Sequence, residues 1–309
     1  SNTDITQVIE HNTTETGLPA IESVGADITI NLGSSSVLNA NSPDRYNKRA
    51  LDVTVQSTSE SQSAGVTPTA TINSAGKVQG MIVKGVSTTQ ATPITVNVTG
   101  GEVYGEAFGI IVDQTASTAN SSTTININNA TVLSSETFYG EAAIYTKGKH
   151  SNKELVKINI GSNGIVDSQS GSAIQAESAA TILNNGTVNG DIKITGDSLI
   201  TNNGNWIIGT YYESYQNNSA ATQIINNGKI GLKTLDLLPG VLVPANFTGN
   251  ITNNGVISLK NGRAGDSITI NGNFSTDNAK INAAGSTGNL TIVVNGTLTT
   301  GYRAEVNAN

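Results

Sequence analysis

The chain has 309 residues and a net charge of −7, with only 13% charged and 4% aromatic residues, whereas a typical soluble domain is about a quarter charged. The absence of cysteine excludes disulfides and thiolate metal sites, and two histidines, His11 and His150, leave little for a zinc centre or a catalytic triad. The negative charge argues against a general nucleic-acid binder, because neutralising phosphates needs a basic surface. We therefore expect a scaffold protein without cofactor, metal or nucleic-acid partner.

Short β-strands are predicted along the first half of the chain, where β-branched and polar residues alternate. Each strand pair follows one plan: a segment such as Ile28-Thr29-Ile30-Asn31, then a corner, then an isolated apolar residue such as Val37. The same plan returns at 71–78, 95–103, 125–132 and 158–166. Insertions that interrupt the period are expected at 41–68, 113–123, 134–142 and 147–155.

The second half of the chain repeats a sharper unit: an apolar pair, Asn-Asn-Gly or Asn-Gly, one residue, then an apolar residue. Copies occupy 182–188, 200–206, 224–230, 251–257, 270–274 and 294–298. From Gly76 to Gly296 the mean period is about 24 residues. Because Asn and Gly populate positive φ most cheaply, we expect these pairs to supply left-handed corners. Trp206 is expected to point inward, in register with Val188 and Ile230.

Short strands joined by corners, with a period of about 24 residues, predict an all-β fold: a parallel β-helix of about a dozen turns with loop insertions. Turns stacked at about 4.8 Å would make a rod about 55 to 60 Å long, with apolar residues inside and asparagine ladders along its corners. We expect an N-terminal cap region over 1–25, a β-helix with insertions over 26–180 and regular turns over 181–309. An array of about three β-sandwich domains is the alternative, although the repeats are short for it.

A more specific signal lies at residues 261–274, which read NGRAGDSITINGNF. This segment resembles a turn near the C-terminal end of many passenger domains of Gram-negative autotransporters, and 251–259 is similar to the turn before it. The resemblance implies a right-handed β-helix that is exported through the periplasm and displayed at the bacterial cell surface. Passenger domains of this family often contribute to virulence. Translocation in that family depends on a C-terminal barrel. Since no barrel-like strands follow here, the resemblance implies the passenger alone, joined to the outer membrane only through a missing barrel.

Two motifs look like catalytic serines, and we expect neither to act as one. Gly196-Asp197-Ser198-Leu199 spells the signature of GDSL esterases, but neither histidine has an aspartate three residues before it. Gly265-Asp266-Ser267 echoes the nucleophile of trypsin-like proteases, but Ile268 stands where a glycine is needed. Both serines lie at corners of the repeat. The sequence therefore predicts no catalytic residue and no enzyme.

Two clusters stand out in a chain that is poor in charged and aromatic residues, and both are candidate ligand-binding sites. The basic candidates are Lys147, Lys149, His150, Lys153 and Lys157. In a chain with 16 Lys and Arg residues, their concentration in one insertion favours contact with a sulfated or carboxylated glycan, although a merely solvated loop is the alternative. The segment 44–49 is a weaker basic case. The aromatic candidates are Tyr211, Tyr212 and Tyr215, which could stack on sugars or anchor a protein.

These observations predict a bacterial surface adhesin that binds host extracellular matrix or a cell-surface glycan, with glycosaminoglycan among the candidates. The first alternative is a self-associating passenger, whose Asn/Thr-rich faces join cells and promote biofilm. A second is a β-helix polysaccharide lyase or hydrolase, because stacked turns could bring Asp191, Asp197 and Asp236 together. A third is a phage tail spike or fibre, which would trimerise.

Overall fold

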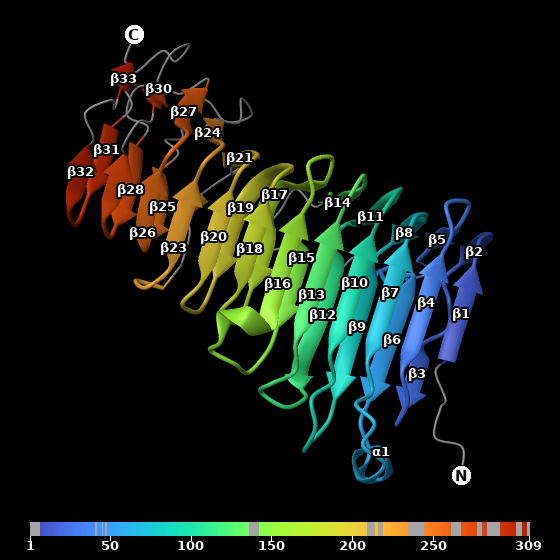
Figure 1. The fold of residues 1–309 in the computed structure, drawn as a ribbon. Coiled ribbons are helices and arrows are strands. Elements are labelled where there is room, and N and C mark those ends of the chain that lie inside the picture. Colours follow the sequence, from blue (N-terminus) through green and yellow to red (C-terminus); the bar gives the residue numbers. More distant parts are fainter. Residues whose placement is uncertain are drawn as a thin grey trace.

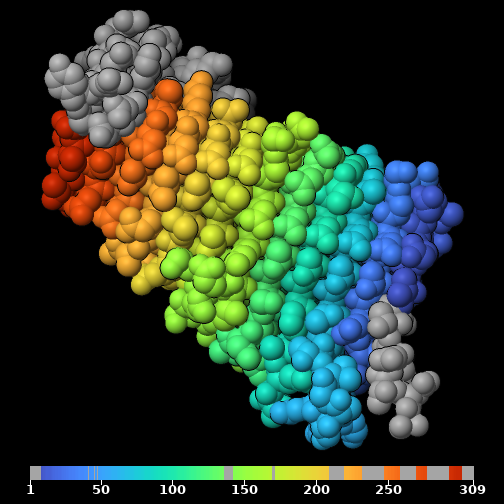
Figure 2. Space-filling view, in the orientation of Figure 1, coloured from blue at the N-terminus to red at the C-terminus, as the bar shows by residue number. Residues whose placement is uncertain are grey.

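The protein is described by a computed structural model, which covers residues 7–40, 42–44, 46, 48–135, 142–208, 214–215, 219–233, 244–260, 267–276, 280–282, 291–300 and 305–307. Its described strands wind into a right-handed parallel β-helix, as Figure 1 shows, so the predicted fold class is confirmed. Successive turns stack as bands from the N-terminal to the C-terminal end of the rod (Figure 2). Each turn before the last contributes described strands to three faces, called here faces A, B and C.

Face A is one parallel sheet of 12 strands, one from each turn, which confirms the predicted dozen turns. Its strands, in spatial order, are β1 (Gln7–His11), β4 (Ile28–Leu32), β7 (Ala70–Ser74), β10 (Ile94–Val98), β13 (Thr123–Ile127), β16 (Val156–Ile160), β18 (Thr181–Asn184), β20 (Leu199–Asn202), β23 (Gln223–Asn226), β26 (Asn250–Asn253), β29 (Phe274–Thr276) and β32 (Leu298–Thr300). The sheet crosses both predicted domain boundaries without a break in its pairing.

Faces B and C share a sheet of 17 strands, because two long strands pass from one face to the other. Face B holds β2 (Thr14–Thr16), β5 (Val37–Asn39), β8 (Lys77–Gln79), β11 (Glu102–Gly105), β14 (Thr131–Ser134), β17 (Ile165–Ala176), β19 (Thr187–Ile194), β21 (Asn205–Ile208), β24 (Lys229–Lys233), β27 (Val256–Lys260), β30 (Lys280–Asn282) and β33 (Glu305–Asn307). Face C holds β3 (Ile21–Val24), β6 (Leu51–Gln56), β9 (Met81–Val86), β12 (Phe108–Ala116), β15 (Ala142–Lys147) and the second halves of β17 and β19.

A separate sheet of four strands takes the place of face C in the later turns. Its strands are β22 (Ser214–Tyr215), β25 (Pro244–Thr248), β28 (Ser267–Asn271) and β31 (Thr291–Val294). Along the chain, β25 follows β24 and precedes β26, so each of these later turns also visits three faces in the same order.

Insertions explain why the period is elastic. One turn takes 18 residues from Asn184 to Asn202, but 42 residues from Asn31 to Asn73. The long turn holds a loop and the one α-helix of the described residues, α1 (Ser59–Ser63). The predicted insertion at 147–155 lies between β15 and β16 and contains a short 3-10 helix, η2 (Lys153–Leu155). Most strands stay short, because extra residues are tolerated more easily at corners than within a pairing register.

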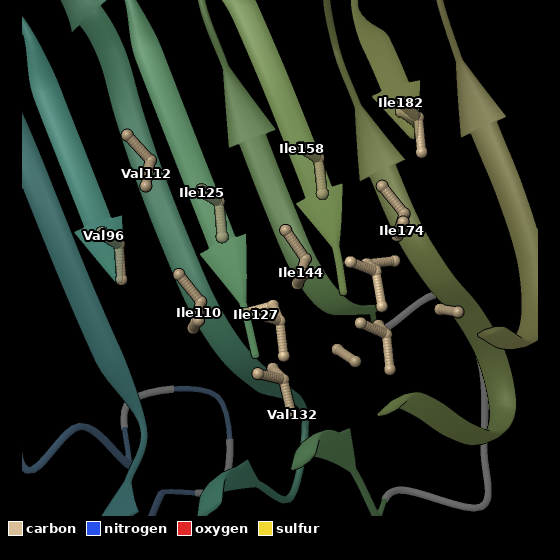
Figure 3. Packing of buried hydrophobic residues seen from close by; sticks show 14 of the residues in the cluster. Val96, Ile110, Val112, Ile125, Ile127, Val132, Ile144, Ile158, Ile174 and Ile182 are labelled. Atoms are coloured by element: carbon tan, nitrogen blue, oxygen red, sulfur yellow. The ribbon is translucent and has the colours of Figure 1, made fainter. Parts of the chain in front are cut away.

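The core is a narrow stack of branched aliphatic side chains. On face A, Ile72, Val96, Ile125 and Ile158 occupy one register position in successive turns, and all are fully buried. Figure 3 shows this column facing residues of face C, such as Ile144, across the interior. Burying each such side chain contributes about 1.5 to 3 kcal/mol, so the stacked columns are the main source of stability.

Trp206 is the largest of the buried side chains, as the sequence register predicts. It pairs with Val188 and Ile230 in the adjacent turns and is 1% exposed. Its indole Nε1 donates to the carbonyl oxygen of Gly190 at 2.9 Å. Its ring packs edge-on against the Phe247 ring, with 6.0 Å between the ring centres.

The explanation expected for the Asn-Asn-Gly corners is wrong. Among the described residues, positive φ occurs at Asn129 and at seven glycines, none of which belongs to an Asn-Asn-Gly copy. These corners have no space for a side chain. A Cβ on Gly228 would overlap the carbonyl oxygen of Gly204 one turn earlier, and a Cβ on Gly255 would overlap the carbonyl oxygen of Gly228. Glycine is therefore required for close approach of stacked backbones rather than for a left-handed conformation.

Two asparagine ladders run along the same corner, as predicted. In the buried ladder, Nδ2 donates to the Oδ1 of the asparagine one turn later, at 2.8 Å, along Asn184, Asn202, Asn226 and Asn253. The Asn253 amide ends the ladder by donating to the Thr276 hydroxyl at 3.3 Å. In the exposed ladder the donation runs toward the earlier turn, at 2.8 to 2.9 Å; its members are Asn185, Asn203, Asn227 and Asn254. The buried ladder satisfies side-chain amides that the apolar core could not accommodate alone.

Candidate binding surfaces

The predicted basic cluster gathers around the corner where face C passes into face A. Lys147 ends β15 on face C, Lys157 lies in β16 on face A, and the exposed Lys149 and Lys153 lie in the insertion between them. The insertion is braced by Asn152, whose Oδ1 accepts the Glu154 N–H at 3.0 Å at the start of η2. The structure therefore brings the four lysines to one edge of the rod.

Carboxylates accompany these lysines. The Lys157 Nζ lies 3.5 Å from the Glu154 carboxylate, in an exposed ion pair. The Lys147 ammonium lies 5.6 Å from the centre of the Tyr145 ring, in a cation–π contact. Tyr145 in turn donates its hydroxyl hydrogen to the Glu177 carboxylate. The edge is consequently mixed in charge, although lysines predominate in the insertion itself.

His150 is the member of the cluster that faces inward. Both ring nitrogens are shielded from solvent without a hydrogen-bond partner, as are the hydroxyls of Thr146 and Ser178. The ring and the Ser178 hydroxyl both border Gly148. Burial lowers the pKa of His150 below its ordinary value of 6.5, and the nearby backbone of Asn152 partly opposes that effect. At neutral pH the side chain is therefore an uncharged anchor of the insertion rather than a cation presented to a ligand.

Only one of the three tyrosines of the predicted aromatic platform lies within the described residues. Tyr211 and Tyr212 lie outside the described residues. Tyr215 belongs to β22, where its backbone pairs with Asn246. The ligand-binding role expected for these tyrosines stays a prediction.

The catalytic look-alike on the described chain has a structural role. Ser198 is 3% exposed; its hydroxyl donates to the Gly196 carbonyl and accepts the Ala180 N–H at 3.0 Å. Asp191 is buried, whereas the exposed Asp197 accepts a hydrogen bond from the Ser219 hydroxyl. Asp236 and Asp266 lie outside the described residues. Within the described ranges, no group of three or more His, Asp or Glu side chains could hold a metal ion.

Face A presents a regular outward array in its N-terminal half. Two outward columns run along it from β4 to β16, one residue per turn: Thr29, Thr71, Thr95, Thr124 and Lys157 in the first, and Asn31, Asn73, Asn97, Asn126 and Asn159 in the second. The asparagines form a third ladder with links of 2.8 to 2.9 Å, and Asn31 donates to the Glu10 carboxylate at its N-terminal end. In later turns the columns include apolar residues such as Leu183 and Leu199.

Face C carries a contrasting surface that the sequence analysis missed. Its outward column reads Lys84, Asp113 and Lys147 in paired register, and Glu177 follows the last paired residue of β17. The column therefore alternates in charge from turn to turn. A four-residue pattern in the sequence could have revealed this charged column. In Ile110-Ile111-Val112-Asp113, the first and third residues point inward, the second points outward, and the fourth is an outward charged residue.

Beside that column lies a pair of aromatic rings. Phe108 and Tyr145 come from successive turns and are both half-buried, with ring centres 5.4 Å apart and planes tilted by 46°. Next to Tyr145 in the same outward column are Ile111 and then Ile82, which are 5% and 4% exposed and lie apart from the main core. Burial, the hydrogen bond to Glu177 and the negative charges of Glu177 and Asp113 raise the pKa of Tyr145, so the phenol stays protonated.

Among the described residues, no helix has the length and hydrophobicity required to cross a membrane. Comparison of the chain with protein-family models, with curated proteins and with solved structures finds no match.

Proposed function

We propose that the chain is an adhesive rod displayed on a bacterial surface, and that face A attaches one copy to another. Surface display is suggested by the autotransporter-like segments at 251–259 and 261–274, which contribute to β26, β27 and β28. The observation that carries the self-association proposal is the threonine and asparagine array of face A. It is long, repeats once per turn and lies on continuous, regular β-structure.

The array is self-complementary in hydrogen bonding. An asparagine amide has two N–H donors and an oxygen that accepts twice, and a threonine hydroxyl both donates and accepts. The ladder of Asn73, Asn97 and Asn126 uses one donor and one acceptor per side chain. Each amide therefore keeps the capacity to bond to an identical array on a second rod.

The array also avoids the usual obstacle to self-association. A patch that meets its own copy brings like charges together, which costs free energy. Between Thr29 and Asn159 the two columns contain Lys157 as their single charged residue, and it is paired with Glu154. Fixed spacing of about 4.8 Å between turns also lets two rods dock at several offsets.

A charge-insertion experiment tests this function without depending on the route of export. Beads coated with the wild-type chain should clump, whereas beads coated with the triple variant T71K/T95K/T124K should stay dispersed, because the lysines repel across the interface. The matched control is T131K/L133K/T187K, which adds the same charge to outward positions of face B. Turbidity or microscopy of the beads gives the measurement.

Mixing provides the decisive outcome. Beads carrying T71E/T95E/T124E should also stay dispersed alone but should clump when mixed with the lysine variant. Persistent clumping of either face A variant alone, or equal loss in the face B control, would show that face A is not the contact.

A second candidate function is adhesion to host matrix or to an acidic glycan through the lysine edge. Exposed Lys149 and Lys153 support it. The carboxylates of Glu154 and Glu177 beside Lys157 and Lys147 reduce the net positive charge, so we rank it after self-association.

A further inference from the structure

We infer that face C binds a neutral polysaccharide strand, laid along the rod axis over the Phe108–Tyr145 pair. This inference uses a different face from the self-association proposal and does not depend on it. It also names a different ligand from the acidic glycan expected at the lysine edge. The site consists of the aromatic pair and the alternating-charge column of Lys84, Asp113, Lys147 and Glu177.

The aromatic pair supplies the apolar component of the site. Sugar rings bury their C–H faces against aromatic side chains, which combine large apolar area with little conformational entropy. Phe108 and Tyr145 are accessible in part and are held by their mutual contact. Tyr145 is further fixed by its hydrogen bond to Glu177, so the platform is ordered before a ligand arrives.

The charged column supplies the polar component. Hydroxyl groups donate as well as accept, so a sugar chain is best bound by ammonium and carboxylate groups side by side. Lys84, Asp113 and Lys147 alternate in register, and Glu177 continues the series. The two positive and two negative groups of the column cancel, and Asp52, 3.9 Å from Lys84, balances Lys193, which pairs with Gln175. The surface therefore gives a polyanion no net attraction but still offers charge-assisted hydrogen bonds to neutral hydroxyls.

The geometry of the column suits a chain rather than a single sugar. Successive turns place these side chains about 4.8 Å apart. That spacing is close to the rise of an extended pyranose chain, so consecutive sugars can meet consecutive turns. Gln175, which pairs with Tyr145 and with Lys193 on either side, adds an amide to the same surface.

The test measures binding of the purified chain to immobilised cello-, malto-, manno- and chito-hexaose, with heparin as the polyanion. We expect retention on at least one neutral hexaose, largely unchanged from about 0.05 M to about 0.5 M salt, because no net charge is involved. Tyr145→Ser and Phe108→Ser should each weaken that binding by at least about tenfold.

Matched variants separate ring loss from misfolding. Tyr145→Phe keeps the ring and should retain most of the affinity, whereas Tyr104→Ser removes an outward aromatic of face B and should have no effect. Circular dichroism and Trp206 emission identify variants that fail to fold. Retention on heparin alone, retention on no neutral hexaose, or full binding by a folded Tyr145→Ser variant would overturn the inference.

Discussion

Asn226 and Asn227 are neighbours in sequence but belong to ladders with opposite exposure. The Asn226 amide accepts from Asn202, donates to Asn253 and is fully buried. The Asn227 amide donates to Asn203 at the surface. Identical chemistry at adjacent positions therefore carries different energetic weight, because water replaces a lost hydrogen bond only where it has access.

This contrast gives a residue-scale prediction. Asn226→Ala should destabilise the fold by about 2 to 4 kcal/mol, since it removes one buried hydrogen bond from each of the Asn202 and Asn253 amides and the side-chain donor to the Val256 carbonyl oxygen. Asn227→Ala should cost less than about 1 kcal/mol, because solvent can satisfy its former partners. Urea unfolding followed by circular dichroism measures both. Equal shifts of the two midpoints would mean that the buried ladder contributes no more than the exposed one.

At the scale of the element, the insertion between β15 and β16 depends on the protonation of His150. Burial lowers the folded-state pKa of this base below the unfolded value of 6.5, so the folded state binds fewer protons in that range. Stability of the insertion is then fully present above about pH 6.5 and decreases as the pH falls from there toward the folded-state pKa.

Hydrogen exchange provides the measurement for this element. Amides of residues 146–155, corrected for intrinsic rates, should exchange faster at pH 5.5 than at pH 7.5, while amides of the face A strand β10 should not. His150→Asn replaces the ring by a side chain that does not titrate, and should abolish the difference. A pH effect that survives in this variant would assign the transition to another group.

Elements also show what sequence can and cannot predict. Strand positions, the inward register of Trp206 and the ladders follow from a period-two pattern and a repeated corner, which are local in sequence. The role of Gly228 could not be predicted, because the obstructing carbonyl belongs to Gly204 in the preceding turn. The Phe108–Tyr145 pair was missed for the same reason: two isolated aromatics become neighbours only when the length of the intervening turn is known.

On the scale of the whole molecule, each turn contacts only the turns before and after it, so stability is close to a sum of neighbouring interactions. We predict that Ile30→Asp, at a fully buried position near the N-terminal end, disrupts the first turns and leaves the urea midpoint of Trp206 emission almost unchanged. Ile200→Asp, in the same turn as Trp206, should lower that midpoint strongly, because it buries an unpaired charge. A shared midpoint in both variants would indicate one cooperative unit instead.

The direction of the backbone hydrogen bonds has a mechanical consequence. On all three faces these bonds join one turn to the next and therefore lie along the rod axis. A pull along the axis stretches every bond between two turns at once, whereas a sideways pull on one end loads a single strand and can unzip the coil turn by turn. A rod held through a long lateral face spreads tension over many turns, and a rod held at its tip concentrates it on the last one.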